Sequence, residues 1–168
     1  MSRHLVIALL ALALAGLIVT SLTIAAPNAA KNSLATQLSG AAQVPPIETL
    51  AKGQAVLRLN SEGTELSYTL RVTDIDNPTM AHIHLGTAKQ NGPVLVWLYP
   101  PAPPAKLIPG KFSGLLAQGK ITTANLVGPL KGKPLKDLIA DIRADKAYVN
   151  IHTQQHPDGE IRGQIKVK

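Results

Sequence analysis

The chain has 168 residues, 45% of them apolar and 16% charged, a composition that excludes a disordered or fibrous protein and favours one globular domain. It contains no cysteine, which excludes disulfides, thiolate metal sites and thiol catalysis. The formal net charge of +7 comes from dispersed lysines and arginines, and because aromatic residues make up only 3% of the chain, nucleic-acid binding is not expected.

Residues 1–30 differ in composition from the rest of the chain. Arg3 is the only Lys, Arg, Asp or Glu among them, and an almost continuous apolar run covers residues 5–26. This pattern predicts a cleaved secretory signal peptide. The run is also long enough to span a bilayer, so an uncleaved N-terminal membrane anchor is the alternative. Either segment places the domain of residues 31–168 outside the cytoplasmic membrane, as a periplasmic, cell-surface or secreted protein.

The first half of this domain has the alternating pattern of β-strands. A short strand is expected around residues 34–38. Polar and apolar residues then alternate over 54–60 and again over 66–72, and the turn residues between the two runs predict a β-hairpin. A third strand is expected through His82 and His84.

The second half is less regular. A fourth strand over residues 93–99 is apolar on both faces, so we expect it at the centre of a sheet. Residues 100–110 hold five prolines and predict an extended loop, and residues 115–123 predict one or two short strands. A short amphipathic helix is expected near 135–145, where Leu135, Leu138, Ile139 and Ile142 share one face, and a last strand over 160–168.

Many short strands with one helix predict a mainly β fold. The expected architecture is an antiparallel β-sandwich of the Greek-key, immunoglobulin-like or superoxide-dismutase-like kind, with the helix covering one end of the sheets. The pattern leaves the pairing of the strands open.

Two histidine-bearing strands have the same layout. Met80, His82 and His84 share one face of an extended strand, and His152 occupies the corresponding face of the strand over 147–152. In both cases a loop, a glycine and a further strand follow. If the two hairpins are neighbours, His82, His84 and His152 converge, and His156 in the second loop reaches the same place.

Converging imidazoles would form a metal site. Imidazole binds copper, zinc, nickel or iron, and the thioether of Met80 favours copper, particularly Cu(I). The predicted ligands are therefore Met80, His82, His84, His152 and His156. With an ordinary pKa near 6.5, such histidines would lose the metal in mild acid. The alternative is that His82 and His84 only lie on the solvent-exposed face of a strand and that Met80 packs at the end of that strand.

Three polar residues close to the predicted site are open to a simpler interpretation. Tyr148 and Asn150 share the strand face of His152, and Arg162 lies in the last strand. We interpret all three as hydrogen-bonding partners on the surface of the sheet rather than as catalytic groups.

Three separated motifs resemble the CHRD domain family. They are LSGAAQVPP at 38–46, AHIHLG at 81–86 with NGPV at 91–94, and YVNIHT at 148–153 with HPDGEIRGQI at 156–165. The CHRD domain is the module repeated in the animal protein chordin and found singly in many exported bacterial and archaeal proteins. The resemblance covers about residues 31–168 and implies an extracytoplasmic, mostly β domain, and the link to chordin implies protein binding.

A second resemblance concerns the site alone. His82, His84 and, much later, His152 are similar in layout to the copper ligands of Cu/Zn superoxide dismutase, which is also an antiparallel sandwich. The dismutase disulfide cannot exist in this chain, and its zinc subsite has no clear counterpart. His156 is the remaining candidate for a fourth imidazole. A similar layout does not carry dismutase activity with it.

These observations support three hypotheses from different functional classes. The first is a non-enzymatic, exported copper-binding protein, and it is the one we favour. The second is an interaction module, without metal, that binds an envelope or extracellular protein. The third is a redox enzyme of the superoxide-dismutase kind.

Overall fold

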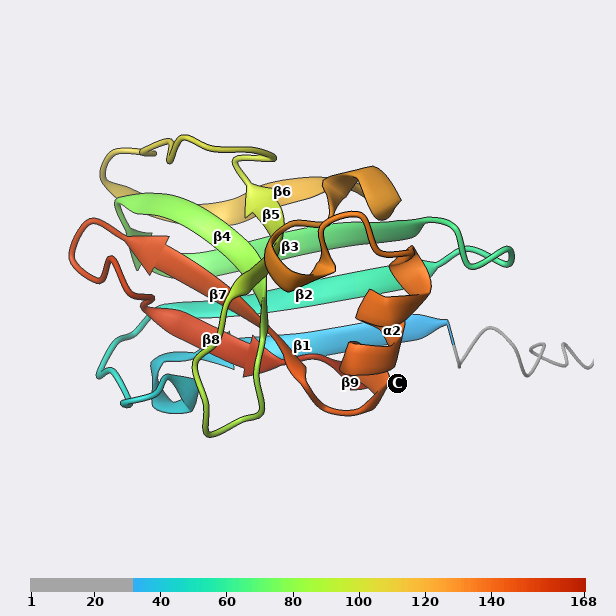
Figure 1. Ribbon diagram of the computed structural model, residues 1–168. Coiled ribbons are helices and arrows are strands. Elements are labelled where there is room, and N and C mark those ends of the chain that lie inside the picture. Colours follow the sequence, from blue (N-terminus) through green and yellow to red (C-terminus); the bar gives the residue numbers. More distant parts are fainter. Residues whose placement is uncertain (1–31) are drawn as a thin grey trace, which may run out of the picture.

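The computed structural model of the protein describes residues 32–168 (Figure 1), and the predicted signal peptide or membrane anchor of residues 1–30 lies outside them. Within the described part of the chain, no helix is long and apolar enough to cross a membrane. The elements in chain order are β1 (Ser33–Ser39), η1 (Gly40–Ala42), β2 (Lys52–Leu59), β3 (Leu66–Asp76), β4 (Pro78–Leu85), β5 (Val94–Tyr99), β6 (Lys111–Ile121), η2 (Thr123–Asn125), η3 (Gly128–Leu130), α2 (Leu135–Arg143), β7 (Ala147–Thr153), β8 (Ile161–Gln164) and β9 (Lys166–Val167).

The strands form one antiparallel sheet that curls into a nearly closed barrel. Its strand order is β5-β4-β7-β8-β1-β2-β3-β6, and β9 pairs with β1. In Figure 1 the half from β5 to β8 lies in front of the half from β1 to β6. The two ends of this strand order are β5 and β6. The hydroxyl of Tyr68 on β3, the neighbour of β6, donates a 2.9 Å hydrogen bond to the carbonyl of Leu98 on β5. The predicted antiparallel β fold with one helix is confirmed, but the strands belong to one continuous sheet rather than to the two sheets of a sandwich.

The predicted β-hairpin is present as β2 and β3. The two strands are paired without a break from Lys52 opposite Thr73 to Leu59 opposite Leu66. Asn60 closes the turn, because its side-chain oxygen accepts hydrogen bonds from the backbone N–H groups of Thr64 and Glu65 at 2.9 and 3.1 Å. β6 then pairs with β3 as one long strand, where the sequence had predicted one or two short ones.

The expectation that the strand over 93–99 is central is wrong. β5 stands at one end of the strand order, although Leu95, Val96 and Leu98 are all buried. Two register shifts against β4 interrupt its alternation. Its open edge is partly covered by the segment after η2, where the N–H of Val127 donates to the carbonyl of Leu95 at 2.8 Å. Its apolar sequence therefore reflects cover from a loop rather than a central position.

The helix α2 confirms the predicted apolar stripe and packs against β7 and β9. It begins directly after Pro134, which supplies the fixed backbone angle that favours a helix start. Asp137 in the first turn and Arg143 in the last turn both suit the helix dipole.

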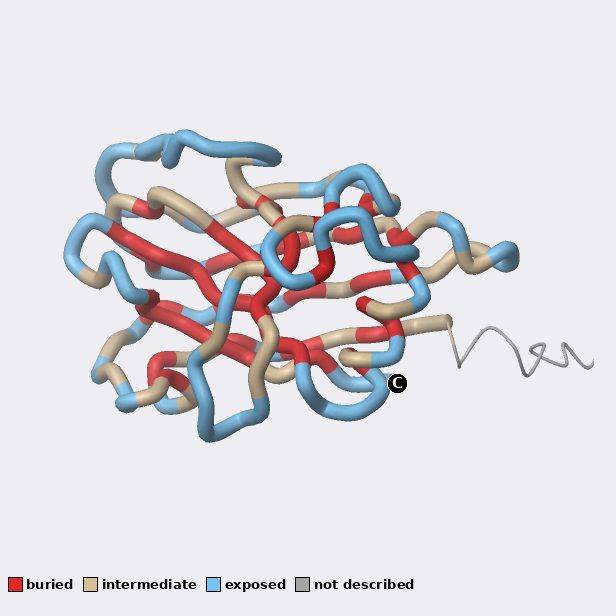
Figure 2. Tube along the Cα trace, in the orientation of Figure 1, coloured by how far each residue is buried: buried red, intermediate tan, exposed pale blue. Residues whose placement is uncertain are grey.

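β7 is buried on both of its faces. Val149 and Ile151 point into the barrel and pack there with Ala81 and Ile83 of β4, and all four are fully buried. The other face of β7 is polar, yet every residue of the strand from Ala147 to Thr153 is buried, as the continuous red of this strand in Figure 2 shows. Polar side chains held on a covered sheet face must find partners there.

Candidate metal centre

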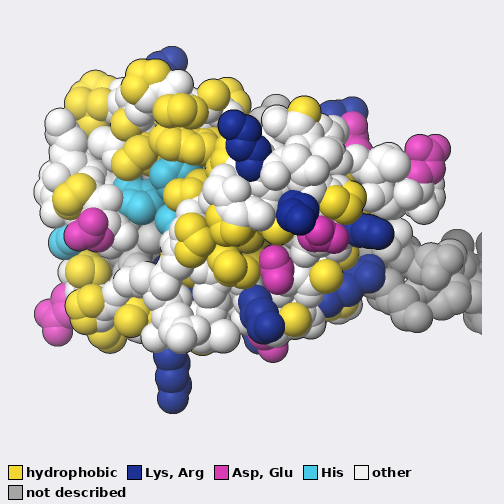
Figure 3. Space-filling view, viewed as in Figure 1, with side chains coloured by type: hydrophobic (Ala, Val, Ile, Leu, Met, Phe, Trp, Pro, Cys, Tyr) yellow, Lys and Arg dark blue, Asp and Glu magenta, His cyan; other side chains and the backbone are white. Residues whose placement is uncertain are grey.

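The two histidine-bearing hairpins lie side by side, as the sequence predicted. β4 and β7 are neighbouring antiparallel strands, with Met80 opposite His152 and His82 opposite Asn150. Each of the side chains of His82, His84 and His152 offers one ligand nitrogen, and these nitrogens lie within 4.8 Å of one another. Figure 3 shows histidine side chains gathered between apolar ones on the face seen in Figure 1.

Backbone carbonyls fix the protonation of two of the rings. Nδ1 of His84 lies 2.9 Å from the carbonyl oxygen of Gly92, and Nδ1 of His152 lies 2.8 Å from that of Pro157. A carbonyl oxygen only accepts, so both Nδ1 atoms carry the proton and donate. In the neutral rings, the Nε2 atoms of His84 and His152 are therefore unprotonated and can bind a metal.

The protonation of the third ring, that of His82, follows from the protonation of His152. Nδ1 of His82 lies 3.1 Å from Nε2 of His152, and since the latter is unprotonated, Nδ1 of His82 donates to it. Nε2 of His82 is then also unprotonated. The Nε2 atoms of His82 and His84 are buried and have no hydrogen-bond partner. Two such orphaned acceptors are costly for a folded protein and indicate a ligand that the site is built to hold.

Burial keeps the three imidazoles neutral. Burial, with repulsion from His152 and His84, lowers the pKa of His82 from 6.5 to about 3. Burial also lowers the pKa of His84 to about 4, against the opposing effect of its hydrogen bond to Gly92. The pKa of His152 is lowered for the same reason. Protons therefore compete with a metal only at lower pH than for ordinary histidines, which corrects the expectation of metal loss in mild acid.

The same shifts predict that acid destabilises the metal-free protein. Unfolded histidines take up protons below about pH 6.5, whereas folded His82 and His84 stay neutral down to about 3 and 4. Between those limits the unfolded state binds more protons, so the free energy of unfolding falls as the pH falls, by about 1.4 kcal/mol per pH unit for each histidine. Urea unfolding at about pH 7 and pH 5 measures this loss. A His82→Gln/His84→Gln variant should show a smaller loss, and equal wild-type stability at both pH values would contradict the prediction.

The spacing of the nitrogens fits a single ion after a small adjustment. Two ligands at about 2 Å from one metal lie on the order of 3 to 4 Å apart. The ligand nitrogens of the three rings lie within 4.8 Å of one another, so ring shifts on the order of 1 Å bring them into this range.

The structure places the other two predicted ligands differently. Met80 lies half-buried directly opposite His152, on the strand face of His82. His156 is not in the group of converging nitrogens. Its backbone shapes the turn, since its N–H donates to Oγ1 of Thr153 at 3.1 Å and its carbonyl accepts from the N–H of Gly159 at 3.0 Å. That turn brings the Pro157 carbonyl to His152.

Trp97, which the sequence did not indicate as part of the site, borders it. Trp97 is opposite His82 in the β4–β5 ladder, and its ring meets the His82 ring edge-on with the centroids 4.2 Å apart. It is the one tryptophan of the chain. Its fluorescence is therefore a reporter placed at the candidate metal centre.

Two stacked side chains, Tyr148 and Arg162, support the His84 ring. The ring of Tyr148 lies parallel to the His84 ring, with centroids 5.1 Å apart, and the guanidinium carbon of Arg162 lies 3.5 Å from the centre of the Tyr148 ring. The Tyr148 hydroxyl accepts a 3.2 Å hydrogen bond from the N–H of Gly92, the residue whose carbonyl binds His84. One side chain thus holds both the ring and the loop that orients it.

Arg162 ties the same loop to the sheet. It donates to the carbonyls of Thr87 and Gln90 at 2.6 and 2.9 Å and to the side-chain oxygen of Asn91 at 2.8 Å. Arg162 is only 1% exposed, and within residues 32–168 no carboxylate forms an ion pair with it. Burial lowers its pKa. Tyr148, Asn150 and Arg162 are hydrogen-bonding partners, as predicted, but all three are buried rather than on the surface of the sheet.

Asn150 links the covering segments on the other side of the site. Its side-chain oxygen accepts a 2.7 Å hydrogen bond from Gln43, and its amide nitrogen donates to the carbonyl of Asp158 at 3.3 Å. Gly159 lies so close that a Cβ there would collide with the Asn150 side chain, and its φ of 119° also favours glycine. The glycine of the second hairpin therefore allows the loop to close over the polar face.

Comparison with known proteins identifies one family. A family model described as the CHRD domain matches residues 34–165, which include the three converging histidines and the side chains that cover them. No curated protein and no solved structure matches the chain.

Proposed function

The chain belongs to the CHRD domain family, and we propose that this member is a non-enzymatic copper-binding protein that acts outside the cytoplasmic membrane. The observation that carries the proposal is the convergence of three buried, neutral imidazoles whose nitrogens lie within 4.8 Å, two of them with an unpartnered Nε2. The predicted export segment of residues 1–30 supports the location.

Copper is favoured over zinc by the donors around the site. Imidazole suits both ions, but the half-buried thioether of Met80 on the same strand face is a soft ligand that favours Cu(I). The chain contains no thiolate that would compete for the ion. A site of this kind fits storage, delivery or tolerance of copper.

A binding role fits the site better than catalysis. His82, His84 and His152 are only 3, 8 and 6% exposed, so a bound ion is held under cover with little room for a substrate. Within residues 32–168 no second group of three His, Cys, Asp or Glu side chains can hold a metal. The proposal therefore includes no zinc subsite of the dismutase kind.

Metal titration of the purified, metal-stripped protein tests the proposal. We expect one copper ion per chain and quenching of the Trp97 fluorescence, because the indole adjoins the His82 ring. Cu(I), Cu(II) and Zn(II) are titrated in parallel at about pH 7, with a competing chelator to set the affinity range. Absence of uptake of both Cu(I) and Cu(II) would overturn the proposal.

Replacing Met80 by leucine tests the preference for copper. Leucine has a similar volume but no sulfur, so we expect Cu(I) to bind about tenfold more weakly while Zn(II) binding changes less than about twofold. The measurement is competition against a Cu(I) chelator and a Zn(II) chelator. Equal Cu(I) affinities of the variant and the wild type would show that Met80 only packs against the strand.

A further inference from the structure

The outer face of β1, β2 and β3 is cationic and lies on the half of the barrel that does not carry the histidines. The segments 33–39, 52–58 and 67–73 contain no acidic residue. Lys52, Arg58 and Arg71 are exposed on this face, and none of them forms an ion pair within the described residues. The face therefore presents uncompensated positive charge on a rigid sheet.

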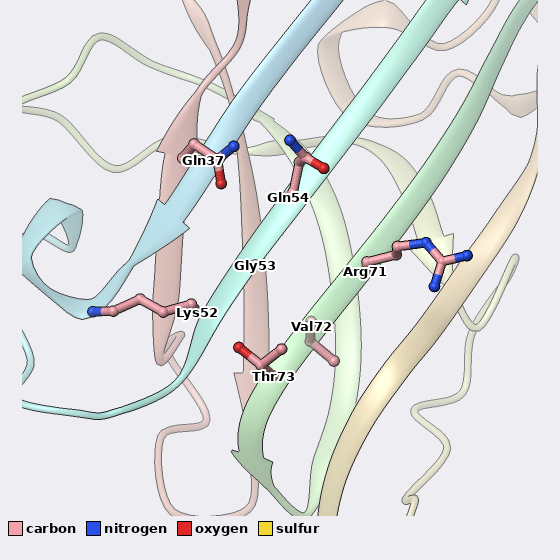
Figure 4. Close-up of a pocket in the computed structure, with 7 residues that line it drawn as sticks. All are labelled: Gln37, Lys52, Gly53, Gln54, Arg71, Val72 and Thr73. Carbon is pink, nitrogen blue, oxygen red and sulfur yellow. The ribbon is translucent and has the colours of Figure 1, made fainter.

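Amide side chains lie beside two of the cations. Gln37, Gln54 and Arg71 stand in one row across the sheet, and Lys52 and Thr73 are paired in the next row. These residues surround an open hollow of about 240 Å³. Figure 4 shows Gln37 and Gln54 side by side, with Lys52 and Arg71 extending in opposite directions from the centre. The charged groups thus diverge along the surface instead of converging on one small anion.

This arrangement selects the class of ligand. The hollow is smaller than the usual pocket for a small molecule, which suits one unit of a longer chain. Within residues 32–168 the exposed large apolar side chains are Leu50, Leu107, Leu115 and Val167. None of them lies in β1, β2 or β3, so these strands offer no exposed apolar anchor for a membrane. Tyr68, the aromatic residue of these strands, points into the barrel, so the face also lacks the aromatic anchors of a protein interface.

We propose that this face binds an extended, carboxylate-bearing polysaccharide. Arg71 and Lys52 pair with carboxylates of successive units, and Gln37 and Gln54 exchange hydrogen bonds with sugar hydroxyls in the hollow between them. Arg58 lies six residues along β2 from Lys52, on the same side of the sheet, and extends the row of cations along the bound polymer. The proposal does not depend on the metal centre.

The test is binding of the metal-free, folded domain to polygalacturonate, measured by calorimetry or on an immobilised polymer at low salt. We expect saturable binding that weakens as salt is raised, and no binding to neutral dextran. A Lys52→Glu/Arg71→Glu variant should bind about tenfold more weakly, because charge reversal replaces attraction by repulsion at two exposed positions.

A matched variant distinguishes binding at this face from a general effect of net charge. Lys131→Glu/Lys133→Glu changes the charge by the same amount at two exposed positions outside the face and should bind within about twofold of wild type. Lys52→Gln/Arg71→Gln should be intermediate, and thermal unfolding checks that all three variants fold. Equal losses in both glutamate variants, or equal or tighter binding to polyglutamate or to anionic lipid vesicles, would overturn the proposal.

Discussion

Replacing His84 by alanine is expected to weaken copper binding more than about a hundredfold. Residues that only orient a metal ligand already contribute about 10- to 100-fold to affinity, so loss of a ligand must cost more. His152→Ala should have an effect of the same size, because both residues direct an unprotonated nitrogen into the group. The measurement is a chelator competition with each variant at about pH 7.

His156→Ala is the matched control for these variants. It removes a histidine from the same hairpin, but this ring lies outside the converging group, so we expect the affinity to stay within about threefold of wild type. Copper at about 100 times its Kd should also raise the free energy of unfolding by about 2.7 kcal/mol in the wild type and in His156→Ala, but much less in His84→Ala. A loss in His156→Ala as large as that in His84→Ala would show that the ligands are wrongly assigned.

Replacing Arg162 by methionine is expected to lower both stability and metal affinity. Methionine removes the donors to the carbonyls of Thr87 and Gln90 and to the side-chain oxygen of Asn91, so these acceptors lose the partner that holds the loop to the sheet. We expect a loss on the order of 3 kcal/mol in the free energy of unfolding, since hydrogen bonds from a charged donor are stronger than neutral ones while relief of the buried charge offsets part of the cost. Copper affinity should fall by about 10- to 100-fold, because the loop that orients His84 loses its anchor.

Two further substitutions define the role of Arg162. Lysine keeps the charge but cannot reach three acceptors as a planar guanidinium does, so Arg162→Lys should recover only part of the stability and affinity. Arg58→Met removes an exposed arginine and should change the free energy of unfolding by less than about 0.5 kcal/mol. Urea unfolding measures all three variants. An Arg162→Met protein as stable as wild type would contradict the role assigned to this side chain.

The local elements and the convergence of the histidines could be predicted from the sequence. Alternation over 54–60 and 66–72 predicts β2 and β3, and the apolar stripe over 135–145 predicts α2. The shared layout of the hairpins that carry His84 and His152 predicts that they are neighbours. These features depend on short-range patterns, which the sequence displays directly.

The closure of the sheet and the cover over the metal centre could not be predicted in this way. Alternation shows which residues share a strand face, but it does not show that a loop will bury that face, so Tyr148 and Arg162 resemble surface residues in the sequence. The partners of Arg162 are mostly backbone carbonyls, which any residue provides. Likewise β5 is apolar because the segment after η2 covers it, and no local pattern distinguishes this from a central strand.

X-ray absorption spectroscopy of the copper-loaded protein identifies the ligands of the bound ion and so tests the proposed metal centre. We expect one copper per chain with three imidazole nitrogens at about 2 Å. Copper bound to the His84→Ala variant should have one imidazole ligand fewer. Copper held by oxygen ligands, or a spectrum that is unchanged when His84 is replaced, would contradict a metal centre built from His82, His84 and His152.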